Sequence, residues 1–99
     1  MSYKSKIEIV PGKKGKQITL FALTTCIWCE KTKELLNELG LEYGFVEFDT
    51  LEDKEQKEAY EEITKYNPNV SFPTMIVNNG EKIIIGFDEE EIRSLANGK

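Results

Sequence analysis

The hydrophobic and polar positions of the chain change their period several times, and each period predicts a different element. Residues 17–23 form a β-branched and aromatic run that predicts a buried strand. Apolar positions at helical spacing come next and stop at Gly40, which ends a predicted helix: Thr32, Leu35, Leu36 and Leu39. Residues 45–49 then alternate apolar and acidic side chains, and this alternation predicts a second strand.

The second half of the chain predicts a helix, a hairpin and a final helix. Residues 51–66 are rich in helix-forming residues with one apolar face, and Pro68 ends this helix because proline cannot continue the hydrogen-bonded turn. Two apolar runs, at 70–77 and 81–86, flank an Asn-Gly turn and predict an antiparallel hairpin. Asp88 is the expected N-cap of the last helix, with a glutamate three residues later as in a capping box.

Residues 1–15 carry a weaker pattern than the rest of the chain. Positions 4–10 alternate only in part and lead into a Pro-Gly-Lys-Lys-Gly turn. We expect the segment to form either an extra strand, paired in a hairpin with the run after Lys16, or a loose arm. The lysines of the turn are expected to be solvated, so we assign the segment no function.

The composition narrows the classes of protein to which the chain can belong. A length of 99 residues suits a single domain over residues 1–99, and 39% hydrophobic with 31% charged residues is typical of a soluble globular protein. The net charge of -5 argues against a nucleic-acid partner, which requires a basic surface. Since the N-terminal apolar run is too short for a signal peptide or a membrane span, we expect a cytoplasmic monomer that makes no membrane contact.

The two cysteines of the chain, Cys26 and Cys29, stand at the predicted junction of the first strand and the first helix. If Cys26 is the N-cap, its sulfur accepts hydrogen bonds from free backbone N–H groups, and the helix dipole favours its thiolate. Cys29, one turn inside the helix, would close a disulfide with it. The alternatives are two ordinary buried cysteines or half of a zinc site, but zinc needs about four ligands and the chain has no histidine. The pattern therefore favours a reversible dithiol/disulfide pair.

Three motifs, together with the order of the elements, resemble those of the thioredoxin superfold and of the glutaredoxin family in particular. They are Thr25-Cys26-Ile27-Trp28-Cys29 after the first strand, Ser71-Phe72-Pro73-Thr74 before the third, and Gly86-Phe87-Asp88 before the last helix. The resemblance covers residues 16–97. It implies an α/β, thioredoxin-like fold in which a central mixed four-stranded sheet is flanked by three helices, with an extra N-terminal strand as an option.

The resemblance also implies roles for individual residues. Cys26 matches the nucleophile of the family, Cys29 its resolving cysteine, and Pro73 the cis-proline that faces the dithiol. Gly86 and Asp88 match the positions that hold the γ-glutamyl end of glutathione. Five further residues are expected to contact the substrate around the dithiol: Thr25, Ile27, Trp28, Phe72 and Phe87.

Three positions depart from the family pattern. Ile27 stands where a proline commonly follows the nucleophile, and Leu23 stands where a lysine would help to bind a thiol carboxylate. Ile85 replaces the first glycine of the usual Gly-Gly pair. Because of Ile27, the redox potential and the thiolate pKa of the family cannot be transferred to this chain. The other two departures concern the recognition of glutathione, so the resemblance leaves the electron donor open.

The function that the resemblance implies is that of a dithiol–disulfide oxidoreductase for protein or small-molecule disulfides, with no tightly bound cofactor. Its electrons would come from a low-molecular-weight thiol or from a flavoprotein disulfide reductase. Two other functions stay open. Some glutaredoxins carry an iron–sulfur cluster between two subunits, although their Gly-Phe-Ser signature is absent from this sequence. A thioredoxin-fold module that senses redox state would instead bind a partner without turnover.

Overall fold

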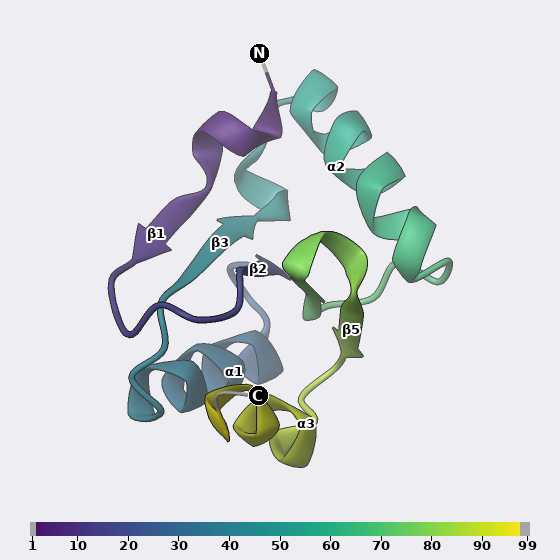
Figure 1. Cartoon of the computed structure of the whole chain (residues 1–99). Helices are drawn as coiled ribbons and strands as arrows, with labels where there is room; N and C mark the ends of the chain where they lie inside the picture. The colour runs from purple at the N-terminus through teal and green to yellow at the C-terminus, as the bar shows by residue number, and fades with distance from the viewer. Residues whose placement is uncertain (1, 98–99) are drawn as a thin grey trace.

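The computed structural model describes residues 2–97, which contain one five-stranded mixed sheet in the order β1-β3-β2-β4-β5 (Figure 1). Its strands are β1 (Glu8–Val10), β2 (Ile18–Ala22), β3 (Tyr43–Glu47), β4 (Thr74–Val77) and β5 (Lys82–Ile85). β2 and β3 run parallel, whereas the other three neighbouring pairs are antiparallel. The predicted thioredoxin-like sheet is confirmed, and β1 is its extra strand.

Helices cover both faces of the sheet. They are α1 (Ile27–Glu38), the crossover between the parallel strands β2 and β3, α2 (Asp53–Tyr66), and α3 (Glu89–Ser94) after β5. Short 3-10 turns complete the described elements: η1 (Tyr3–Lys6), η2 (Phe48–Thr50), η3 (Asn78–Gly80) and η4 (Leu95–Asn97). α1 and α3 lie together on one face and α2 covers the other (Figure 1). Between residues 2 and 97, no helix is both long and apolar enough to cross a membrane.

The side chains of β2 alternate between two apolar cores, one on each face of the sheet. Leu20 faces α1 and α3, where it joins Leu36 and Ile92, and Phe21 faces α2, where it joins Ile63. All five side chains are at most 1% exposed. Burial on both faces explains why β2 is an unbroken apolar run in the sequence.

β1 pairs with the outer edge of β3, so the expected hairpin with the run after Lys16 is wrong. The reason is that both edges of β2 are already occupied, by β3 and by β4. Gly44 of β3 makes room for the N-terminal segment, since a Cβ atom there would lie 2.8 Å from Ile7 Cγ2. Buried Tyr3 packs its ring 5.7 Å from that of Phe21 and fastens the segment to the α2 core.

Several element boundaries differ from the sequence expectation. β4 begins only at Thr74, within the apolar run of residues 70–77. β3 ends at Glu47, two residues before the end of the alternating run, and the apolar Phe48 belongs to the η2 turn instead. The β4–β5 hairpin is antiparallel as predicted, but its connection is longer than a two-residue Asn-Gly turn. Asn78 and Asn79 both adopt positive φ there, at 52° and 60°, a conformation that asparagine tolerates better than most residues.

Candidate active site

The two cysteines lie where β2 ends and α1 begins. Cys26 is the N-cap of α1, and its Sγ accepts a hydrogen bond from the backbone N–H of Cys29 over 3.1 Å. The Cys26 N–H in turn donates to the Leu23 carbonyl at 3.3 Å, which closes the loop before the helix. The geometry expected for Cys26 at the helix start is therefore the geometry observed.

The two thiols differ in their access to solvent. Cys26 is half-buried, whereas Cys29 is 0% exposed. Burial, followed by the hydrogen bond with Cys26, raises the pKa of Cys29 to about 12. Cys29 is therefore a protected thiol, and Cys26 is the sulfur that a substrate can reach.

Lys33 supplies positive charge on the side of α1 that carries Cys29. It stands four residues after Cys29, so the two side chains share a helix face. The Lys33 ammonium lies 3.2 Å from the Glu47 carboxylate and 4.2 Å from the centre of the Phe45 ring. Its charge acts to lower the pKa of Cys29, but burial has the larger effect.

The loop between α2 and β4 faces the dithiol. The Phe72–Pro73 peptide bond is cis, and the Phe72 carbonyl oxygen lies 4.0 Å from Cys26 Sγ. Pro73 is buried beside the dithiol, in the position that the family resemblance implied. The backbone of Phe72 thus lies beside the Cys26 sulfur.

A buried amide holds this loop in place. Asn67, the C-cap of α2, is 3% exposed, and its Nδ2 donates to Ser71 Oγ at 3.1 Å and to Thr74 Oγ1 at 3.0 Å. Thr74 Oγ1 donates to the Ser71 carbonyl at 2.6 Å. Between them Val70 has a φ of 46°, a left-handed conformation that is strained for a β-branched residue. Such strain persists only where surrounding contacts over-determine the backbone.

Four aromatic side chains pack in pairs close to the dithiol in the sequence or in space. Trp28 and Phe87 stack with ring centroids 5.7 Å apart and planes 25° from parallel. Phe72 packs against Phe48 with centroids 5.5 Å apart. Trp28, Phe72 and Phe87 also line a hollow of about 190 Å³ whose floor includes Pro73 and Gly86. Trp28 is 53% exposed, as its predicted docking role requires, and Phe72 and Phe87 are half-buried.

The remaining predicted site residues lie at the rim of this hollow or beside the dithiol. Thr25 and Ile27 flank Cys26 and are exposed, Ile27 to 66%. Gly86 has a φ of 78°, which only glycine adopts readily, and it joins β5 to the loop carrying Phe87. Asp88 is the N-cap of α3 and accepts from the Glu91 N–H at 3.2 Å. Its carboxylate therefore has a structural partner as well as an exposed position.

A pair of hydrogen bonds between Thr24 and Asp49 at the start of the active-site loop was not predicted from the sequence. Asp49, in η2, accepts hydrogen bonds from both the backbone N–H and the hydroxyl of Thr24. The Thr24 contacts lower the pKa of Asp49. The sequence pattern places Asp49 at the end of a strand, and nothing in its spacing links it to Thr24. The sequence around Asn67 likewise gives no sign of its buried hydrogen-bond partners.

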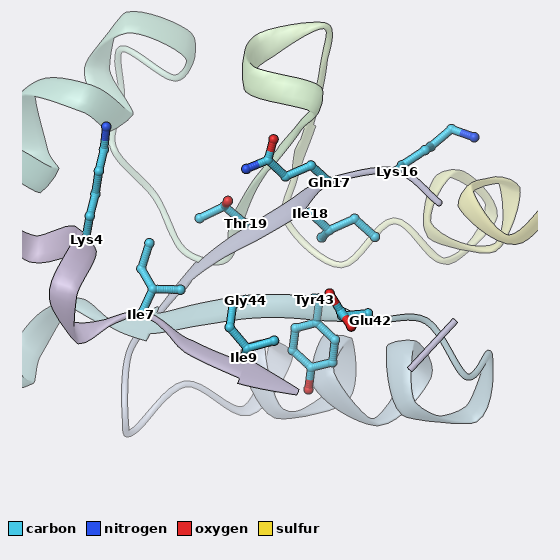
Figure 2. Close-up of a pocket in the computed structure, with 10 residues that line it drawn as sticks. All are labelled: Lys4, Ile7, Ile9, Lys16, Gln17, Ile18, Thr19, Glu42, Tyr43 and Gly44. Carbon is cyan, nitrogen blue, oxygen red and sulfur yellow. The ribbon is translucent and has the colours of Figure 1, made fainter. Parts of the chain in front are cut away.

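A second hollow, of about 400 Å³, lies where β2 and β3 begin (Figure 2). The dithiol instead follows the end of β2. Ile7 and Ile9 close over Gly44 on one side of the hollow, and Lys4 and Lys16 extend away from each other at its two ends (Figure 2). Among residues 2–97, no group of three metal-ligating side chains comes together.

Comparison with known proteins agrees with this geometry. A model of the glutaredoxin family matches residues 18–83. A glutaredoxin-like 8.6 kDa protein of the rubredoxin operon of Clostridium pasteurianum is 30% identical over 78 residues, 79% of this chain and 95% of that protein. The structure of a glutaredoxin from Methanosarcina mazei Go1 shares 46% identity and a TM-score of 0.85, over 93% of this chain and 88% of that one. Methanosarcina acetivorans methanoredoxin shares 41% identity and a TM-score of 0.77, over 88% and 99% of the two chains.

Proposed function

The chain belongs to the glutaredoxin family, and from that premise we propose that it reduces the disulfides of proteins and small molecules through Cys26 and Cys29. The family and the Cys-x-x-Cys pair support thiol–disulfide redox chemistry. One observation supports different roles for the two cysteines: Cys26 is accessible at the N-terminus of α1, whereas Cys29, one turn further along the helix, is buried. Cys26 is therefore the nucleophile and Cys29 the resolving thiol.

The reaction takes place in two exchange steps. The Cys26 thiolate attacks one sulfur of a substrate disulfide, forming a Cys26–substrate disulfide while the other substrate sulfur leaves and takes up a proton. Cys29 then loses its proton and attacks Cys26 Sγ, which releases the second substrate sulfur as a thiol. Two electrons have passed to the substrate, and the protein holds a Cys26–Cys29 disulfide.

The donor that restores the dithiol is a second thiol or a flavoprotein disulfide reductase. Reduction by a small thiol reverses the same exchange: one thiol attacks the Cys26–Cys29 disulfide at Cys26, and a second displaces the adduct. Neither route needs a tightly bound cofactor in the protein. Supplying oxidised protein with glutathione, another small thiol or a flavoprotein reductase, and following loss of the disulfide, identifies the donor.

Trapping experiments test the proposed roles of the cysteines. In Cys29→Ser the second step is blocked, so a protein disulfide substrate should remain covalently attached to Cys26 on a non-reducing gel. Cys26→Ser is the matched control and should give no adduct, because a serine hydroxyl is not ionised near neutral pH. An adduct through Cys29 in Cys26→Ser, with none in Cys29→Ser, would reverse the assignment. The absence of exchange with any disulfide would remove the proposed function.

A further inference from the structure

The apolar surface beside Cys26 extends well beyond the dithiol. We define the docking surface as Ile27 and its neighbour Trp28, together with the side chains that follow Trp28, each in ring contact with the one before or sharing a hollow with it: Phe87, Phe72, Phe48 and Tyr60. Five large hydrophobic side chains of the described residues are strongly exposed, and three of them, Ile27, Trp28 and Tyr60, belong to this surface. A soluble chain leaves such a contiguous patch uncovered when it serves binding.

The shape of the docking surface suits a polypeptide better than a small molecule. Its hollow of about 190 Å³ is below the ~300–1,000 Å³ typical of small-molecule pockets. It is instead of the size that one large apolar side chain fills. The hollow lies directly beside Phe72, whose carbonyl faces Cys26. A chain segment that presents its disulfide to Cys26 therefore has a place for an apolar neighbour.

Negative charge borders the docking surface. Eight exposed carboxylates lie within three residues of a surface side chain or line its hollows: Glu30, Asp49, Asp53, Glu58, Glu61, Asp88, Glu89 and Glu90. The cations that meet the same criterion are Lys31 and Lys57, and Arg93 lies 2.9 Å from the Glu89 carboxylate. The excess is negative, like the net charge of -5 for the whole chain.

We infer that the preferred substrate of this protein is a protein disulfide in an exposed segment that carries basic residues and a large apolar side chain next to its cystine. This inference rests on the proposed disulfide reductase function and specifies its substrate. The apolar side chain fills the hollow between Trp28 and Phe72, and the basic residues meet the bordering carboxylates. A second copy of the chain is a poor occupant because its own docking surface has the same charge.

Matched peptides test the inference. Each peptide contains one disulfide and a phenylalanine beside it, and the two differ only in carrying lysines or glutamates as flanking residues. We measure the second-order rate constant for their attack by Cys26 in the Cys29→Ser variant. The lysine peptide should react about tenfold faster at low ionic strength. The advantage should largely disappear between about 0.01 M and about 1 M salt, as the screening length falls from about 30 Å to about 3 Å.

Charge reversal locates the effect on the protein. Asp53→Lys/Glu90→Lys should remove the preference for the lysine peptide. Glu42→Lys/Glu81→Lys changes the net charge by the same amount at the opposite end of the sheet and should retain the preference. Replacing the peptide phenylalanine with alanine should slow the reaction with the Cys29→Ser protein. It should not slow the reaction with the Cys29→Ser protein that also carries Trp28→Ala. Circular dichroism establishes that each variant is folded before rates are compared.

The outcomes separate this inference from the proposed function. Equal rates for the two peptides, together with rapid attack on both, would overturn the inference and leave the disulfide reductase function in place. Equal loss of preference in both charge-reversed variants would also overturn it, because net charge rather than the docking surface would then explain the selectivity. Failure to attack either peptide or a small disulfide such as bis(2-hydroxyethyl) disulfide would overturn the proposed function itself.

Discussion

Cys26 and Cys29 occupy neighbouring positions at the start of α1, yet only Cys29 is closed off from solvent. The sulfur of Cys26 accepts a hydrogen bond from the backbone N–H of Cys29 on one side, and on the other side it faces the Phe72 carbonyl. The sulfur of Cys29 is not accessible to solvent, and its burial raises its pKa to about 12. The proposed order of the two exchange steps rests on this difference, since only a reachable sulfur can begin the reaction.

Alkylation measures the difference directly. Iodoacetamide at pH 8 should modify Cys26 in the Cys29→Ser variant at least about a hundredfold faster than Cys29 in the Cys26→Ser variant, because the buried thiol is neither accessible nor ionised. Intact mass against time gives both rates. Unfolding each variant in denaturant is the control and should make the rates similar. Comparable rates in the folded variants would contradict the burial of Cys29.

Asn67 acts on the site at a distance, through the loop that carries Phe72. Replacing it with alanine removes the two side-chain hydrogen bonds to Ser71 and Thr74, and we expect a loss of about 1–3 kcal/mol in the free energy of unfolding. Because the loop would no longer hold Phe72 beside Cys26, KM for a peptide disulfide should rise. The rate of attack on a small disulfide, which needs no docking edge, should change little.

Asn69→Ala is the matched control for this prediction, because Asn69 is an exposed asparagine of the same loop. It should leave both KM and stability near those of the parent. If Asn67→Ala slowed peptide and small disulfides by the same factor, the loop would not be a docking edge, and Asn67 would have only a structural role.

At the level of elements, the end of β5 and the start of α3 serve both the fold and the site. Gly86 turns the chain, Phe87 stacks on Trp28, and Asp88 caps α3. α3 is only six residues long, so its cap matters, yet it contributes the fully buried Ile92 to the core shared with α1. The same three-residue motif therefore joins a helix start to the rim of the docking surface.

Two substitutions separate the roles of Asp88. Asp88→Ala should lower the free energy of unfolding by about 1 kcal/mol because the cap is lost, whereas Asp88→Asn should keep the cap and most of the stability. If the carboxylate also binds the amino end of a thiol donor, both variants should raise KM for that donor. Chemical denaturation and donor kinetics give the two readouts. Equal stability of the alanine variant and the parent would contradict the capping role.

At the scale of the whole molecule, the active site and the N-terminal segment occupy different parts of the sheet. The dithiol lies where β2 ends, and the family model begins only at residue 18. The preceding η1 and β1 add a strand and fasten it to α2, through Tyr3 in the core and the Tyr3 N–H on the Glu58 carboxylate at 2.9 Å. This segment therefore contributes stability, while the chemistry belongs to the remainder.

Stability at alkaline pH reports on this attachment. Burial, followed by the nearby Glu62 and Glu58 carboxylates, raises the pKa of Tyr3 from 10.0 to about 12. A raised folded-state pKa means that the stability is fully present below pH 10 and is lost as the pH rises through about 12. The loss by pH 12 should be about 2 kcal/mol.

Tyr3→Phe should not show this loss in the free energy of unfolding at alkaline pH, because phenylalanine keeps the ring but has no ionisable hydroxyl. The measurement is the free energy of unfolding of the variant and the parent between pH 8 and pH 12. Tyr60→Phe, at an exposed tyrosine, is the control and should follow the parent. Parallel pH profiles of Tyr3→Phe and the parent would contradict the buried hydroxyl.

The sequence by itself determined the features that depend on neighbours along the chain. The periods of 2 and 3.6 identified β3, α1 and α2, because side-chain burial repeats with the geometry of each element. Continuous apolar runs identified β2 and the β4–β5 hairpin. The position of Cys26 before a helix was enough to predict its N-cap role, which needs only the backbone N–H three residues later. The Asp88 cap was predicted for the same reason.

Only the tertiary structure decided which distant residues meet. Asp49 accepts a hydrogen bond from Thr24, which lies 25 positions earlier in the chain. β1 pairs with the edge of β3 because both edges of β2 are already paired. Phe48 and Phe72 form one surface only after η2 and the loop before β4 are brought together. The burial that separates Cys29 from Cys26 has the same origin. Each of these contacts joins residues that are far apart in the sequence and depends on how whole elements pack together. The local pattern of hydrophobic and polar residues does not specify that packing.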